Sequence, residues 1–209
     1  NGWNIDTLND NSRGRQSNWN FTLNRFRWGT KTKITDDVDF NHRWVWEFRT
    51  WDGPDRYKKE VDFSEIIWDK FNLSLRNFAD MPLNVVIGRQ DIMFGRGWLV
   101  MDGTNIDEGR TIYFDALRLT YEIPNKDTTL DMIYIDQRAD SSAWLKPFAD
   151  SHNYMNWHDQ KGAIVYLTNR SRPNLQLEGY FIYKGENAVN STFADSDVYT
   201  VGGAASGVL

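Results

Sequence analysis

The chain has 209 residues, with 24 Lys and Arg against 29 Asp and Glu and a formal net charge of −5. No run of apolar residues is long enough for a membrane-spanning helix, but a barrel strand needs an apolar residue only at every second position. The acidic excess falls in the long connections and the basic excess in the first strand. This distribution argues against nucleic acid as a partner, which binds a basic outer surface.

The first stretches of the chain predict a loop and then a strand. Residues 1–16 are polar and rich in turn-forming residues, so we expect a loop there. In the strand that follows, the apolar positions change phase between Leu23 and Phe26. A change by one residue predicts a β-bulge, because every later side chain would otherwise turn to the opposite face.

The remaining strands follow from period-two alternation. It is clearest at residues 40–48, where aromatic residues and His42 alternate with mostly polar residues. Seven more strands are expected near residues 70–76, 83–94, 111–123, 130–135, 163–167, 175–184 and from 197 onward. Gly88 is expected at a second bulge that turns Arg89 and Asp91 to the polar side.

The connections between these strands alternate in length. Short ones are expected at 35–38, 77–82, 124–127 and 170–174, and long ones at 52–62, 95–110, 140–159 and 185–196. Outer-membrane barrels have tight periplasmic turns and long external loops. We therefore predict an all-β fold, an antiparallel up-and-down transmembrane β-barrel in a bacterial outer membrane of the Gram-negative type.

The domain prediction follows from the strand count. Residues 1–209 form part of a single barrel domain in this interpretation. Nine strands are an odd number, whereas bacterial single-chain barrels have an even one. We therefore expect at least one strand before residue 1 and further strands after residue 209.

The polar stripes carry the candidate functional residues. Guanidinium groups are always charged and bind carboxylates through paired hydrogen bonds, so a pore lined with them favours anions. The candidate pore-lining or substrate-binding residues are Arg25, Arg27, Lys31, Lys33, Arg43, Arg49, Lys70, Arg76, Arg89 and Arg118. The alternative is a cross-strand ladder that fills the wall, with Glu47, Asp69, Asp91, Asp115 and Glu122 as the pairing acids.

Aromatic residues are the candidates for contact with outer-membrane lipid. Trp and Tyr are favoured at membrane–water interfaces, where one end of the ring stays wet. The predicted interface anchors are Trp44, Trp46, Trp51 and Trp98. Trp144 and Trp157 lie inside a predicted loop, where they cover the pore, stack on sugar rings or form the loop's own hydrophobic cluster.

No enzyme motif is present in the sequence. Nucleophile-elbow, zinc-protease and phosphate-loop patterns are missing, so we expect neither enzymatic activity nor a cofactor. His152 and His158 share a loop, but the chain has no cysteine and the pair has no evident ligand geometry. No metal site is expected.

Two phrases resemble the alginate-export family of outer-membrane barrels. They are PLNVVIGRQ at 82–90, ending in Phe94-Gly95, and FDALRLTYE at 114–122. The resemblance implies a monomeric barrel of about 18 strands whose arginine-rich lumen passes an anionic polysaccharide such as alginate outward. Arg89 and Arg118 match the family's lumenal arginines. The acids Asp115, Glu122 and Asp131 depart from the pattern, because they add negative charge near those arginines.

The first functional hypothesis is an outer-membrane channel or porin for anionic small molecules or an anionic polysaccharide. The rival is a structural sleeve around a protein partner, such as an electron-transfer protein, that conducts nothing. A soluble β-sandwich or ligand-binding barrel is a third reading.

Overall fold

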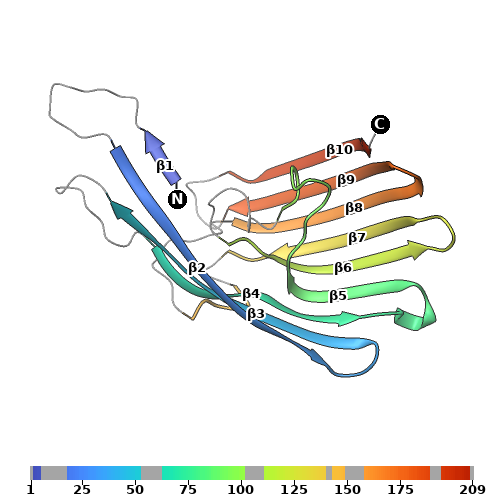
Figure 1. Cartoon of the computed structure of the whole chain (residues 1–209), viewed down its shortest axis with the longest axis horizontal. Coiled ribbons are helices and arrows are strands. Elements are labelled where there is room, and N and C mark those ends of the chain that lie inside the picture. The colour runs from blue at the N-terminus through green and yellow to red at the C-terminus, as the bar shows by residue number, and fades with distance from the viewer. Residues whose placement is uncertain are drawn as a thin grey trace.

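The structure is a computed structural model that describes residues 2–5, 18–52, 63–101, 111–139, 143–148, 158–188 and 194–207. Ten strands form one antiparallel sheet in chain order (Figure 1). The strands are β1 (Gly2–Ile5), β2 (Asn18–Lys33), β3 (Val38–Asp52), β4 (Phe63–Leu75), β5 (Leu83–Gln90), β6 (Phe114–Ile123), β7 (Thr128–Gln137), β8 (His158–Arg172), β9 (Leu175–Ala188) and β10 (Ser196–Gly207).

The topology confirms the all-β, antiparallel, up-and-down prediction. Each strand pairs with its neighbours in sequence, and β1 and β10 are the two ends of the strand order, so the sheet is not closed. A single 3₁₀ turn, η3 (Phe78–Asp80), is the helical element in the described part of the chain. None of the described residues belongs to a helix long and apolar enough to cross a membrane.

The alternation of short and long connections is also confirmed. The turns β2–β3, β4–β5, β6–β7 and β8–β9 lie at one end of the sheet (Figure 1), and the strand bounds leave more residues between β3 and β4, β5 and β6, and β7 and β8 than these turns contain. The turn residues explain the tight ends, because Asn77, Asn125 and Asn174 have positive φ. Asn tolerates this left-handed conformation better than most residues.

Two expectations near the start of the chain are wrong. Residues Gly2–Ile5 form β1, which pairs with the beginning of β2, whereas we expected a loop throughout 1–16. The β2–β3 register is continuous from Asn20 to Lys33, so the bulge expected after Leu23 does not occur. The unbroken pairing places Leu23 on the same face as Arg25, because side chains two residues apart in a continuous strand point to the same side.

The irregular positions lie further along the sheet. The β3–β4 register shifts between Arg43 and Trp44, which places Asp69 as the extra residue between Trp68 and Lys70. The second bulge, expected at Gly88, does not occur either, because the pairing of β5 with β4 and with β6 runs through Gly88 without a register shift. The backbone of Gly88 is still unusual: its φ is 116°, and a Cβ there would lie 2.4 Å from a backbone oxygen of β4. Only glycine fits this position without strain.

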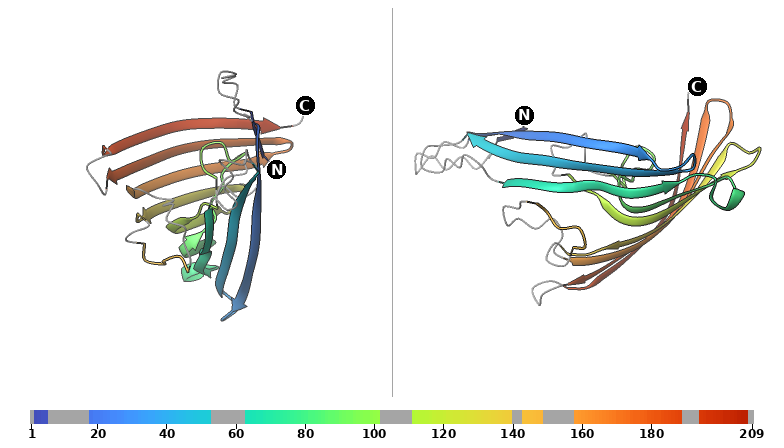
Figure 2. Two further views of the ribbon diagram at one scale, coloured as in Figure 1. Left: turned by 90° about the vertical axis from the view of Figure 1, so that its left-hand side faces the viewer. Right: turned by 90° about the horizontal axis from the view of Figure 1, so that it is seen from below.

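The sheet is strongly curved (Figure 2). Its two faces differ in composition. We call the outer one the convex face. It carries large apolar side chains that are 37% to 82% exposed in all nine strands from β2 to β10. These are Phe26, Trp28, Trp46, Leu73, Ile87, Leu117, Met132, Tyr134, Val165, Leu167, Leu177, Phe181, Tyr199 and Val201. A water-soluble single sheet normally buries such a face.

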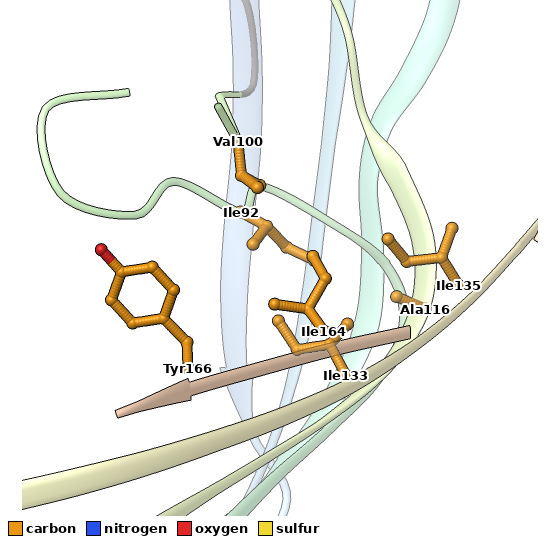
Figure 3. Packing of buried hydrophobic residues seen from close by; sticks show 7 residues of the cluster. All are labelled: Ile92, Val100, Ala116, Ile133, Ile135, Ile164 and Tyr166. Carbon is orange, nitrogen blue, oxygen red and sulfur yellow. The ribbon is translucent and has the colours of Figure 1, made fainter. Parts of the chain in front are cut away.

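The opposite, concave face has both a charged half and an apolar half. The charged half comprises β2–β4 with Arg25, Glu47 and Asp69. The apolar half comprises β6–β8, where buried Ile133 and Ile164 contact the chain that follows β5. Figure 3 shows that chain crossing above the strands, with its side chains pointing down onto them.

Candidate functional site

A chain of ion pairs runs along the concave face of β2–β4. Glu47 binds Arg25 at 2.5 Å, and Asp69 binds both Arg27 at 3.0 Å and Arg43 at 2.9 Å. Asp69 and Glu47 are fully buried, which carboxylates tolerate when paired and hydrogen-bonded. The bulge at Asp69 is what brings this one carboxylate within reach of arginines from two strands.

The network continues into the connection that follows β5. Asp91 binds Arg43 at 2.8 Å and Lys70 at 2.7 Å, so the first residue of this connection is fixed to the wall. Two cations therefore share one acid, and its carboxylate is partly open to solvent. The position of Asp91 on the polar side agrees with the sequence prediction.

The far end of the same connection is fixed to the wall as well. The backbone N–H of Thr111 donates to Glu47 at 2.8 Å, and its hydroxyl donates to the same carboxylate at 2.9 Å. Arg27 donates to that hydroxyl at 3.1 Å. Tyr113 packs with Val45 and Ile67 in a small buried cluster. The described parts of the connection are therefore held against the concave face at both ends.

Two further groups of charges lie outside this network. On β6, Arg118 binds Asp131 at 2.8 Å, and the Thr120 hydroxyl donates to the same carboxylate. At the short-turn end, Asp39 accepts from both Lys31 and Arg76. The hydrogen bond to Asp39 raises the pKa of the Arg76 guanidinium, which lies in the turn after β4.

Arg89 lies inside the wall. β5 pairs with β4 only over Phe71–Leu75, which leaves the first half of β4 without a β5 partner. The Arg89 guanidinium fills this position: it donates to the carbonyl oxygens of Trp68 and Leu145 and binds Asp115 through two hydrogen bonds. Its side chain is 1% exposed. A side chain so enclosed presents no surface to a solute, so this arrangement does not support the pore-lining role expected for Arg89.

The remaining predicted residues of the polar stripes are Lys33, Arg49 and Glu122. Lys33 pairs with Asp36 in water at the short turn. Arg49 shares the concave face with Glu47 through the β3 alternation. Glu122 is exposed and accepts a weak hydrogen bond at 3.5 Å from Asn84, not from a predicted guanidinium among the described contacts.

The four predicted interface anchors do not all lie on the convex face. Trp44 and Trp46 belong to the convex face, where Trp44 contacts the rings of Phe26 and Trp28. Trp51 is the last residue but one of β3, but its side chain lies outside the described part of the structure, as do Trp157 and His152. Trp98 differs from the prediction, because the chain turns onto the concave face at buried Ile92 and carries Trp98 with it.

The basic stripe is largely neutralised by these contacts. Four cations of the β2–β4 network, Arg25, Arg27, Arg43 and Lys70, face the acids Glu47, Asp69 and Asp91, and buried Glu65 lies directly opposite Glu47 in the register. The cross-strand ladder that the sequence left as an alternative is thus present. Chemically, the charged half of the concave face is a polar surface with alternating charges.

Sequence reasoning missed a pocket on the apolar half of the concave face. A cavity of about 600 Å³ lies between residues 94–100 and strands β8–β10. Tyr166, Glu178 and Tyr180 line it from the strands. The alternation of side chains along β8 and β9 indicated that these three residues share one face. It could not predict the pocket, because the pocket also needs residues 94–100 to fold over that face.

Comparison of the chain with protein-family models, with curated proteins and with solved structures gives no match. The resemblance to the alginate-export family therefore stays a prediction. Within the described residues, no group of three or more His, Cys, Asp or Glu side chains is arranged to hold a metal ion.

Proposed function

We propose that this chain is part of the wall of an outer-membrane β-barrel that acts as a channel for hydrophilic, preferentially anionic solutes. The observation that carries the proposal is the exposed apolar convex face, which every strand from β2 to β10 shares. Such a face is suited to contact with lipid, because the strands of outer-membrane barrels alternate apolar residues facing the lipid with polar residues facing the lumen.

Strand length supports the same proposal. Crossing a bilayer takes about 9–11 residues of tilted strand. Every strand from β2 to β10 except β5 has ten or more residues. The described strands belong to one sheet, so no second sheet of described residues covers the convex face. A soluble sandwich would need such a cover.

The concave face supports passage of charged solutes. Arg25, Arg27 and Arg43 keep 17% to 24% of their side-chain surface accessible while paired. An anion in the lumen therefore meets several weak guanidinium sites in series, which allow it both to bind and to leave. The pairing acids lower the anion preference below that of an unpaired basic wall.

Planar-bilayer recording of the purified protein tests this function. In a KCl gradient, the proposal expects stepwise conductance and a reversal potential of the sign given by chloride flux exceeding potassium flux. A preference for cations would contradict the assignment of anionic solutes. The absence of any conductance would contradict the proposed channel function.

A non-conducting sleeve is the second candidate, and one observation favours it. Ile92 and Val100 from the connection after β5 pack onto the apolar half of the concave face, so part of the enclosed space is already filled. In that case the bilayer stays silent and a protein partner co-purifies in detergent. The same recordings therefore separate the two candidates.

A further inference from the structure

The cavity over β8–β10 combines a broad aromatic surface with hydrogen-bond acceptors. Phe94, Tyr166 and Tyr180 form a stack of near-parallel rings, with centroids 4.2 Å and 5.4 Å apart and interplanar angles of 8° and 9°. Tyr180 also lies against Gly202, where an added Cβ would come within 2.5 Å of its hydroxyl. The stack therefore ends against β10 on the Tyr180 side and forms a broad aromatic floor.

A second aromatic group is open to a ligand. Trp98 lines the cavity from the loop and is 84% exposed, so most of its indole surface is available for stacking. Ligand pockets are lined mainly by hydrophobic and aromatic side chains, so an exposed ring beside a pocket is suited to contact a ligand. An indole ring can stack on the flat C–H face of a ring-shaped ligand.

The polar groups of the cavity determine the charge of the ligand. Glu178 lines it and is held in place by the Tyr166 hydroxyl at 2.6 Å and by the Gln176 amide. An ionised carboxylate only accepts hydrogen bonds, so it binds hydroxyl or ammonium donors and repels another carboxylate. Arg96 also lines the cavity, but it is exposed and water screens its charge.

We propose that this cavity is a binding subsite for a neutral saccharide, with one sugar ring stacked on Trp98 and its hydroxyl groups donating to Glu178. The volume of about 600 Å³ lies within the range of small-molecule sites. A sugar ring has the required combination of an apolar face and a rim of hydroxyls. The inference is independent of conduction, since it concerns binding on the concave face alone.

Calorimetric titration of the purified protein in detergent tests the subsite with two matched probes. Methyl glucoside and methyl glucuronide differ only at C6, where a hydroxymethyl group replaces a carboxylate. We expect the glucoside to bind about tenfold more tightly. Trp98→Ala should weaken glucoside binding about tenfold, whereas Trp144→Ala, which changes another exposed tryptophan outside this cavity, should leave it unchanged.

A second variant tests the role of charge. Glu178→Gln keeps a side-chain oxygen but removes the negative charge, so the preference for glucoside over glucuronide should shrink. No binding of the glucoside, equal affinity for both sugars in the parent protein, or equal effects of the two tryptophan variants would overturn the subsite. If the protein conducts anions but does not bind the glucoside, only the subsite proposal is contradicted. If it binds the glucoside but shows no conductance in bilayers, only the channel proposal is contradicted.

Discussion

Arg89 and Asp115 form a two-pronged ion pair inside the sheet, with N–O distances of 2.8 and 2.9 Å. The Arg89 guanidinium also lies 3.6 Å from the centroid of the Tyr113 ring. The pair completes the wall at the point where β5 stops pairing with β4. It therefore connects β4, β5 and β6 without lining the enclosed space.

The first prediction concerns stability. Arg89→Gln should lower the free energy of unfolding by about 3–5 kcal/mol, because it leaves a buried carboxylate without its partner. Urea unfolding in detergent, followed by tryptophan fluorescence, measures the loss. Lys33→Gln is the control, since it removes an exposed pair and should cost less than about 1 kcal/mol. Equal losses in the two variants would contradict a structural role for Arg89.

The second prediction concerns ion selectivity. Asp91→Asn should increase the anion preference of the proposed channel, because Asp91 is shared by Arg43 and Lys70 and is partly exposed. Removing it frees positive charge towards the lumen. The reversal potential in a KCl gradient reports the change. Asp36→Asn removes the same charge at the short turn, and an equal shift there would show that position in the wall does not matter.

The third prediction concerns the connection between β5 and β6. Thr111→Val removes the hydroxyl that donates to Glu47 and accepts from Arg27, so the end of the connection should loosen. We expect larger or noisier single-channel conductance, since the described parts of the connection lie against the concave face. Thr120→Val is the matched control on β6, because its hydroxyl binds Asp131 in the wall. Identical recordings from both variants would rule out a constricting role.

The fourth prediction concerns the convex face. Leu167→Arg should reduce stability in a bilayer by about 2–4 kcal/mol if Leu167 lies near the midplane. In a water-soluble protein, the same change at a residue that is 41% exposed should fall within about 0.5 kcal/mol. Refolding into liposomes at graded urea concentration measures the difference. Asn174→Arg, in the β8–β9 turn, should have little effect in either case.

Much of the fold was predictable because strand alternation is a local signal. The stripe at residues 40–48 and the turns near 124–127 give β3, β6 and β7 directly. The faces are predictable too, since Leu117 and Arg118 lie on opposite sides as expected. The bulge at Asp69 was also visible in principle: the apolar phase passes from Trp68 to Phe71, but the predicted strand began only at Lys70.

The failures have a common physical cause, which is dependence on distant contacts. β1 is four residues long, and its strand state depends on pairing with β2. The enclosure of Arg89 depends on Trp68 and Leu145, which are 21 and 56 residues away in sequence. Trp98 moves to the concave face because Ile92 is buried there. Residue type singled out Arg89 and Trp98 as candidate functional residues, but it did not predict which surface each side chain would face.

Depth-dependent quenching in lipid vesicles tests the central claim most directly. The chain has no cysteine, so single cysteines at Val165 and Phe181 on the convex face and at Lys126 in the β6–β7 turn can each carry one fluorophore. If the convex face contacts lipid, doxyl-labelled acyl chains quench the first two labels strongly and the turn label weakly, while aqueous iodide does the reverse. Strong iodide quenching at all three positions, with no effect of the doxyl lipids, would contradict the membrane-barrel account.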